Sequence, residues 1–137
     1  MARIMAIDYG RKRVGIAVTD ENQIIANALT TVHAKDVFEF LDNYLKKEEV
    51  ECIVVGEPKD WQNKDSEAAV FINPFVKKLK KLYSDLRIER HDESYTSILA
   101  KQAMIDGGLK KKARSKKELI DKISATLILQ SYMETRQ

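Results

Sequence analysis

The chain of 137 residues lacks several features that define common classes of protein. It has one cysteine, Cys52, so an internal disulfide and a cysteine-ligated zinc site are both excluded. It has only two prolines and five glycines, and it shows neither a Pro/Gly/Ser-rich linker nor an internal repeat. Its net charge of +3 is too small to require a nucleic-acid partner by itself. These observations favour one domain over residues 1–137, with a buried thiol in a reducing cytoplasm.

Long apolar runs are also missing. No stretch approaches the roughly 20 residues of a membrane-spanning helix, and the N-terminus does not have the layout of a signal peptide. Hydrophobic residues make up 44% of the chain and charged residues 33%, which is ordinary for a soluble globular domain. We therefore expect a cytoplasmic protein without contact to a membrane.

The hydrophobic pattern that is present predicts a meander of strands followed by alternating helices and strands. The predicted strands are 3–8, 13–19, 24–32, 51–56 and 86–91. Four helices are predicted. The first begins at a capping box of Asp36 and Glu39, the second covers 66–83 with a kink or an interruption at Pro74, and the third covers 96–106. The last begins at a capping box of Ser115 and Glu118 and ends near Met133. This order predicts an α/β fold, in which a mixed five-stranded sheet has a three-stranded antiparallel meander and two parallel strands, with helices on its faces.

Three groups of acidic residues lie near the ends of predicted core strands or in the first turns of a core helix. Asp8 ends the first strand, Asp92 and Glu93 end the fifth, and Asp121 lies early in the last helix on the same face as Ala125. A single acid at such a place is typical of a cap or an ion pair. Strand ends in an open α/β sheet share one rim, however, and carboxylates gathered there repel one another unless they hold a divalent cation. Oxygen ligands favour Mg²⁺ or Mn²⁺, and the residues alone do not choose between Asp92 and Glu93.

The stretch DYGRKRVGIAVTD, from Asp8 to Asp20, resembles the opening motif of the YqgF/RuvX family. Three further motifs of that family have counterparts in the correct order, VVGEP, DESYTS and DKISATLILQSY, so the resemblance covers the whole chain. These bacterial proteins have an RNase H-like fold and are described as Holliday junction resolvases and as nucleases that mature the 5′ end of 16S rRNA.

The resemblance implies a metal-dependent endonuclease that hydrolyses phosphodiester bonds in precursor 16S rRNA, with ribosomal particles as candidate partners. The alternatives are a Holliday junction resolvase acting on branched DNA and a non-catalytic nucleic-acid-binding module of the same fold. A resolvase would cut as a homodimer, whereas the sequence leaves open whether this chain is a monomer or a homodimer.

By the same resemblance, the catalytic residues and ligands of Mg²⁺ or Mn²⁺ are Asp8, Glu93 and Asp121. The chain departs from the family at Ser94, where an arginine is usual, and at Glu57, where an apolar residue is common. Glu57 ends the fourth strand and could replace or supplement Glu93, and Asp92 is a second alternative.

Two basic runs accompany the proposed acids. Gly10 would leave room for a phosphate beside the backbone, and Arg11, Lys12 and Arg13 would bind neighbouring phosphates. The second run precedes Asp121 and is expected to bind the nucleic-acid backbone through Lys110, Lys111, Lys112 and Arg114. Such runs are otherwise typical of solvated loops, so their position beside the acids carries the functional interpretation.

Overall fold

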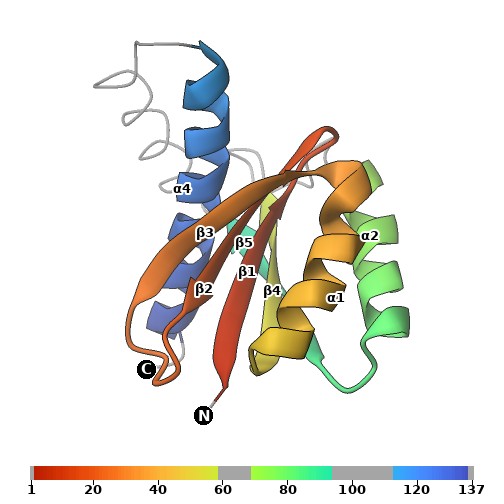
Figure 1. The fold of residues 1–137 in the computed structure, drawn as a ribbon, viewed down its shortest axis with the longest axis vertical. Helices are drawn as coiled ribbons and strands as arrows, with labels where there is room; N and C mark the ends of the chain where they lie inside the picture. The colour runs from red at the N-terminus through yellow and green to blue at the C-terminus, as the bar shows by residue number, and fades with distance from the viewer. Residues whose placement is uncertain (1, 59–68, 94–112, 136–137) are drawn as a thin grey trace.

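Five strands form one mixed sheet at the centre of the molecule, which was analysed as a computed structural model (Figure 1). The structure describes residues 2–58, 69–93 and 113–135, and within these ranges the side chains of 58, 69, 92, 93 and 113–122 are not described. The strands are β1 (Arg3–Tyr9), β2 (Arg13–Thr19), β3 (Ala26–His33), β4 (Val50–Pro58) and β5 (Arg87–Glu93).

The order across the sheet is β3-β2-β1-β4-β5. The pairs β1–β2 and β2–β3 are antiparallel, whereas β1–β4 and β4–β5 are parallel. This confirms the predicted meander with two added parallel strands. Because β1 is the middle strand, its carboxyl end lies between β2 and β4.

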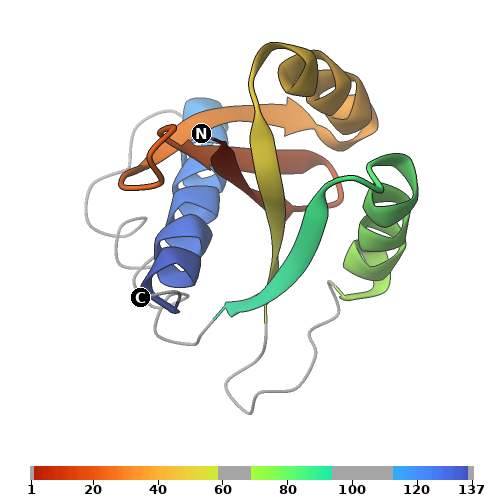
Figure 2. The ribbon, with the colours of Figure 1, turned by 90° about the horizontal axis from the view of Figure 1, so that it is seen from below.

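Helices cover both faces of the sheet. One face carries α1 (Val37–Lys47), which follows a short 3₁₀ helix (Ala34–Asp36), and α2 (Ala69–Leu82). The other face carries α4 (Ala113–Thr135), as the view from below in Figure 2 shows. Within the described residues, no helix is long and apolar enough to cross a membrane.

The two faces of the sheet are packed in different ways. Toward α1 and α2 the strands present branched and long side chains, among them Met5, Ile7 and Ile53. Toward α4 they present Ile4 and Val54 together with several smaller residues, which are Ala6, Gly15, Ala17, Cys52 and Gly56. Small side chains allow a helix to approach the backbone of a sheet closely, and α4 fills this surface with Ala125, Ile128, Leu129 and Tyr132.

Several predicted element ends are wrong. The Asp36 side chain makes no capping hydrogen bond, because Asp36 already belongs to the 3₁₀ helix that leads into α1. α4 begins at Ala113, so Ser115 lies inside the helix and does not cap it. Ile24 and Ile25 do not belong to β3 but stand exposed in the preceding turn, at 69% and 59% exposure.

Pro74 does not interrupt its helix as predicted, since α2 runs through it from Ala69 to Leu82. Proline removes one backbone hydrogen bond, and burial of Ile72, Phe75 and Leu79 on either side holds the helix together. The predicted helix 96–106 and most of the predicted loop 57–65 lie outside the described residues, although Glu57 and Pro58 extend β4.

Candidate active site

Asp8 lies near the carboxyl end of the central strand β1, on the face of the sheet that α4 covers. It pairs with Gly15 of β2, and the next residue, Tyr9, stacks on Phe75 of α2 with ring centroids 4.1 Å apart. Since successive side chains of a strand point to opposite faces, Tyr9 faces α2 and Asp8 faces α4. The Asp8 side chain is partly buried.

Gly56 lies beside Asp8 on the neighbouring strand. β4 runs parallel to β1 with Val55 beside Ile7, so the next residues along the two strands are Gly56 and Asp8. A Cβ atom at position 56 would overlap Cδ1 of Ile128, a residue of α4. The absence of a side chain at Gly56 therefore lets α4 pack on the backbone of β4 next to Asp8.

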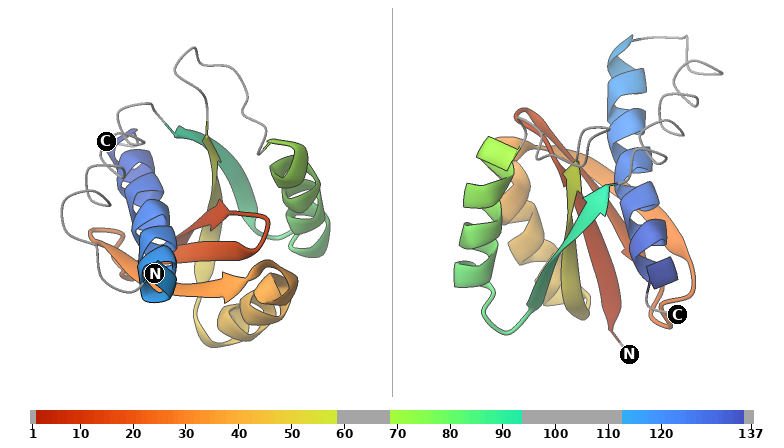
Figure 3. Two further views of the ribbon diagram at one scale, coloured as in Figure 1. Left: turned by 90° about the horizontal axis from the view of Figure 1, so that it is seen from above. Right: turned by 180° about the vertical axis from the view of Figure 1, so that it is seen from behind.

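Asp121 belongs to the part of α4 that extends toward the carboxyl ends of these strands. It precedes Ile128 by seven residues, which is about two turns and roughly 10 Å of helix. Figures 1 and 3 show α4 antiparallel to β1, with its N-terminal half reaching past the end of β4. Position 121 thus lies beyond Asp8 along the strand direction, on the same side of the sheet.

The strand register places position 93 on a different face of the sheet from Glu57 and position 92, its two alternatives as a metal ligand. In the β4–β5 pair, position 93 is level with Pro58 and position 92 with Glu57. Position 93 therefore alternates in step with Glu89, which contacts α4 through a hydrogen bond from Tyr132. Position 92 alternates in step with Ile88, which packs against the cluster beneath α1 and α2.

Glu57 lies on the face opposite to Asp8. It follows Gly56 on β4, and its carboxylate forms an ion pair with Arg90 of β5, with 2.6 Å between Oε1 and the guanidinium nitrogen. The Glu57 side chain is only 15% exposed and that of Arg90 30%. This ion pair explains how a carboxylate is tolerated at such a sheltered position.

The basic hairpin after Asp8 is held in a defined position. The backbone N–H of Gly10 donates to the carbonyl of Arg13 at 3.1 Å, and that of Ala34 donates to the carbonyl of Lys12 at 2.9 Å. The Arg11 guanidinium lies over the ring of Phe71 in α2, 4.7 Å from its centroid. The hairpin is therefore tied both to the sheet and to α2.

Gly10 has a role within the hairpin itself. A Cβ at this position would lie 2.7 Å from the carbonyl oxygen of Arg13, and the φ angle of Gly10 is not positive. Glycine is needed here because the two arms of the hairpin approach closely, which the sequence did not reveal.

The second basic run is only partly described. Lys110, Lys111 and Lys112 lie outside the described residues, and Arg114 lies in the first turn of α4. Within the described residues, no group of three or more His, Cys, Asp or Glu side chains could hold a metal ion. The side chains of Glu93 and Asp121 are not among them, so the metal site stays a prediction.

Sequence reasoning missed two polar residues near these acids. Ser124 of α4 is fully buried and lies one turn after Asp121. The other is Arg90, which is paired with Glu57. Two features of the sequence could have indicated them. Ser124 interrupts the apolar pattern of the last helix, and Arg90 belongs to the alternating charges of RIERHDE.

The carboxyl-terminal half of α4 is fastened to β5 by a polar cluster. The Tyr132 hydroxyl donates to Glu89 at 2.5 Å, and Arg87 contacts the same carboxylate at 2.7 Å. The hydrogen bond from Tyr132 lowers the pKa of Glu89, while burial and Glu89 raise the pKa of Tyr132 to about 12. Burial raises the pKa of the Cys52 thiol, so this cysteine is an unreactive member of the core.

Comparison with known proteins agrees with this architecture. Residues 2–135 match the RuvX family, which is described as Holliday junction resolvase. The chain belongs to this family.

RuvX relatives are close over the full length of the chain. Proteins named "Putative pre-16S rRNA nuclease" are 56% identical in Phocaeicola vulgatus and 55% identical in Bacteroides fragilis, each over 100% of this chain and 99% of the relative. Among solved structures, YeaZ from Pseudomonas aeruginosa has a TM-score of 0.45 and 17% identity, over 80% of this chain and 51% of that one. A similarity at that level carries no argument about function.

Proposed function

We propose that this chain is a metal-dependent endonuclease that hydrolyses phosphodiester bonds in precursor 16S rRNA. The observation that carries the proposal is the position of Asp8, partly buried at the carboxyl end of the central strand and directly before a fixed basic hairpin. Membership of the RuvX family supports nuclease activity, and the names of the relatives support the choice of substrate.

Asp8, Glu93 and Asp121 would hold Mg²⁺ or Mn²⁺. Carboxylate oxygens are the ligands that these ions prefer, and positions 8, 93 and 121 all belong to the α4 side of the sheet or to α4 itself. When bound, such an ion activates water and neutralises charge that develops on the phosphate. Glu57 is a poor substitute for Glu93, because it is paired with Arg90 on the opposite face.

The basic hairpin would bind the nucleic-acid backbone next to the acids. Arg11 and Lys12 are both exposed, and the Arg11 guanidinium lies over the ring of Phe71. A hairpin that is already held in place loses little conformational entropy on binding phosphates. Arg13 begins β2 and would contribute from the base of the hairpin, and Lys110, Lys111, Lys112 and Arg114 would extend this basic surface.

Holliday junction cleavage is the second candidate, because the family description names it. It requires two active sites related by symmetry, and therefore a homodimer.

If the substrate is ribosomal RNA, the protein would act in the cytoplasm, with ribosomal particles as its partners.

The deciding experiment compares both substrates in one assay. Purified protein is incubated with end-labelled precursor 16S rRNA and with a synthetic four-way DNA junction, in Mg²⁺, in Mn²⁺ and in EDTA. We expect metal-dependent cleavage of the RNA by the native chain and none by Asp8→Asn, whose shape is conserved but whose charge is lost. Cleavage of the junction alone would favour the resolvase, and binding without any cleavage would identify a non-catalytic module.

A further inference from the structure

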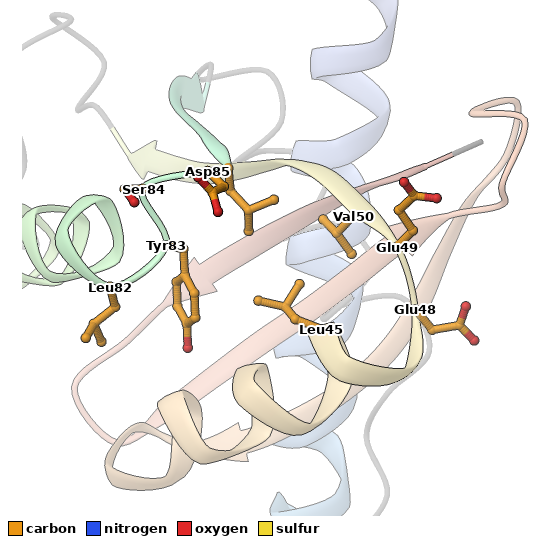
Figure 4. A pocket seen from close by; sticks show the side chains of 9 residues that line it. Leu45, Glu48, Glu49, Val50, Leu82, Tyr83, Ser84 and Asp85 are labelled. Carbon is orange, nitrogen blue, oxygen red and sulfur yellow. The ribbon is translucent and has the colours of Figure 1, made fainter.

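A cavity of about 310 Å³ lies at the end of the strands that is opposite to Asp8. It is formed where α1 ends, β4 begins and α2 turns into β5 (Figure 4). The start of β4 pairs with Arg3, at the other end of the seven-residue strand β1 from the hairpin, roughly 20 Å away. The cavity is therefore separate from the proposed active site at the carboxyl end of β1.

The floor of the cavity is apolar. Leu45 of α1, Val50 of β4 and Leu86 contribute to it, and the Tyr83 ring stands between Leu45 and Leu82 (Figure 4). Leu82 continues the apolar stripe of α2 but is 52% exposed, whereas Leu79, one turn earlier, is fully buried. The stripe thus extends past the core of the protein and ends at this cavity.

The walls of the cavity are fixed rather than free to collapse. The Tyr83 hydroxyl donates to Asp42 of α1 at 2.6 Å, which ties the residue after α2 to α1 beside the cavity. Burial and this carboxylate raise the pKa of Tyr83, which further favours the protonated hydroxyl that donates to Asp42. The backbone N–H of Leu86 donates to the carbonyl of Tyr83 at 3.0 Å, which closes the turn between α2 and β5.

The charged residues that line the cavity are all acidic: Glu48, Glu49 and Asp85. Glu48 is partly neutralised by Arg3, at 3.5 Å, whereas Glu49 and Asp85 are exposed. Lysines of the last turns of α1 and α2, such as Lys46 and Lys81, lie outside this lining. The charged lining of the cavity is thus acidic, in a chain whose net charge is +3.

We propose that this cavity binds a short basic segment of a partner protein, with a lysine or arginine next to an apolar residue. The aliphatic stem of the basic side chain would lie on Leu45 and Tyr83, and its charged end would reach Glu49 and Asp85. The apolar neighbour would cover Leu82. The carboxylates repel the phosphates of a nucleic acid, so the protein would hold RNA at one end of the strands and a partner protein at the other.

The inference is tested with the heptapeptide GKLRLKG, acetylated and amidated, and with GELELEG as the matched acidic control. Each is titrated into the ¹⁵N-labelled full chain at low salt, and amide shifts are followed by NMR. We expect shifts confined to residues 45–50 and 82–86 with the basic peptide alone. Because the chain has a net charge of +3, unspecific electrostatic attraction would favour the acidic control peptide. Selective binding of the basic peptide would therefore indicate a specific site.

Charge-reversed variants localise the binding. Glu49→Lys with Asp85→Lys should weaken the basic peptide at least tenfold, whereas Glu39→Lys with Glu134→Lys changes the net charge equally and should alter it less than twofold. Leu82→Ser, at an exposed position that should not disturb folding, should weaken it about threefold. Equal effects of the two charge-reversed pairs, equal binding of the acidic peptide, or shifts elsewhere would overturn the proposal.

Two further measurements test the nature of the occupant and the independence of the two edges. If the chain alone sediments as a dimer that Glu49→Lys with Asp85→Lys dissociates, the occupant is a second copy and a distinct partner protein is excluded. RNA cleavage should be unchanged in this variant, since the cavity lies at the far edge of the sheet. Loss of cleavage in it would show that the two edges are not independent and would overturn the assignment.

Discussion

Ile128 of α4 packs directly on Gly56 of β4, where a Cβ would overlap its Cδ1 atom. Gly56 lies beside Asp8, and Asp121 lies two turns before Ile128 on the same helix. The contact therefore sets how closely the helix with one proposed ligand approaches the strand with another.

Gly56→Ala should destabilise the protein by about 1–3 kcal/mol, because a methyl group is forced into a filled site. Ile128→Val removes the Cδ1 atom that the methyl group would meet, so the double variant should recover much of that loss. Urea unfolding of the native chain, both single variants and the double variant measures this coupling. Simple additivity of the two changes would show that α4 shifts away instead.

The acids at the strand ends should differ strongly in their effect on cleavage. Glu93→Gln should lower kcat at least 10²-fold, whereas Glu57→Gln should lower it less than tenfold, because Glu57 is paired with Arg90 on the other face. Asp92→Asn, at a position level with Glu57, is the control for the loss of one negative charge at the end of β5. The reverse ranking of Glu93 and Glu57 would move the second ligand to β4.

The second basic run should provide affinity that does not depend on sequence. Replacing Lys110, Lys111 and Lys112 by alanine should weaken binding to every nucleic acid by a similar factor. The slope of log affinity against log salt should fall by roughly 0.7 to 0.9 for each phosphate that the variant no longer neutralises. Binding at several salt concentrations and kcat at saturating substrate measure both effects, and kcat should change less. An unchanged salt slope would identify the run as a solvated loop.

The contact between Tyr132 and Glu89 should stabilise the fold in a pH-dependent way. The pKa of Glu89 is lowered in the folded protein, so the stabilisation is present above its usual value of 4.5 and is lost as the pH falls through the folded value. Tyr132→Phe removes the donor, and its destabilising effect should shrink as the solution is acidified across this range. Urea unfolding as a function of pH measures it.

Glu89→Gln provides the matched control for that experiment. In this background the titrating carboxylate is absent, so Tyr132→Phe should have an effect that does not vary with pH between neutral and acidic solution. A pH dependence that persists there would assign the effect to a different group.

The sequence alone predicted the order of the strands along the chain and the mixed sheet, because apolar alternation and turn residues are local signals. β2 begins and ends where the pattern placed it, at Arg13 and Thr19. Asp8 and the basic residues after it were also found locally, since a charge at the end of an apolar run stands out without any knowledge of its neighbours.

Only the tertiary structure decided which residues face one another. That Glu57 meets Arg90, that Gly56 makes room for Ile128, and that Leu82 reaches a cavity rather than the core all depend on register and helix packing. These relationships join segments far apart in the chain, and a shift of one residue in register would exchange the faces of every side chain in a strand. Local patterns contain no information about such a shift, so the faces had to be read from the folded chain.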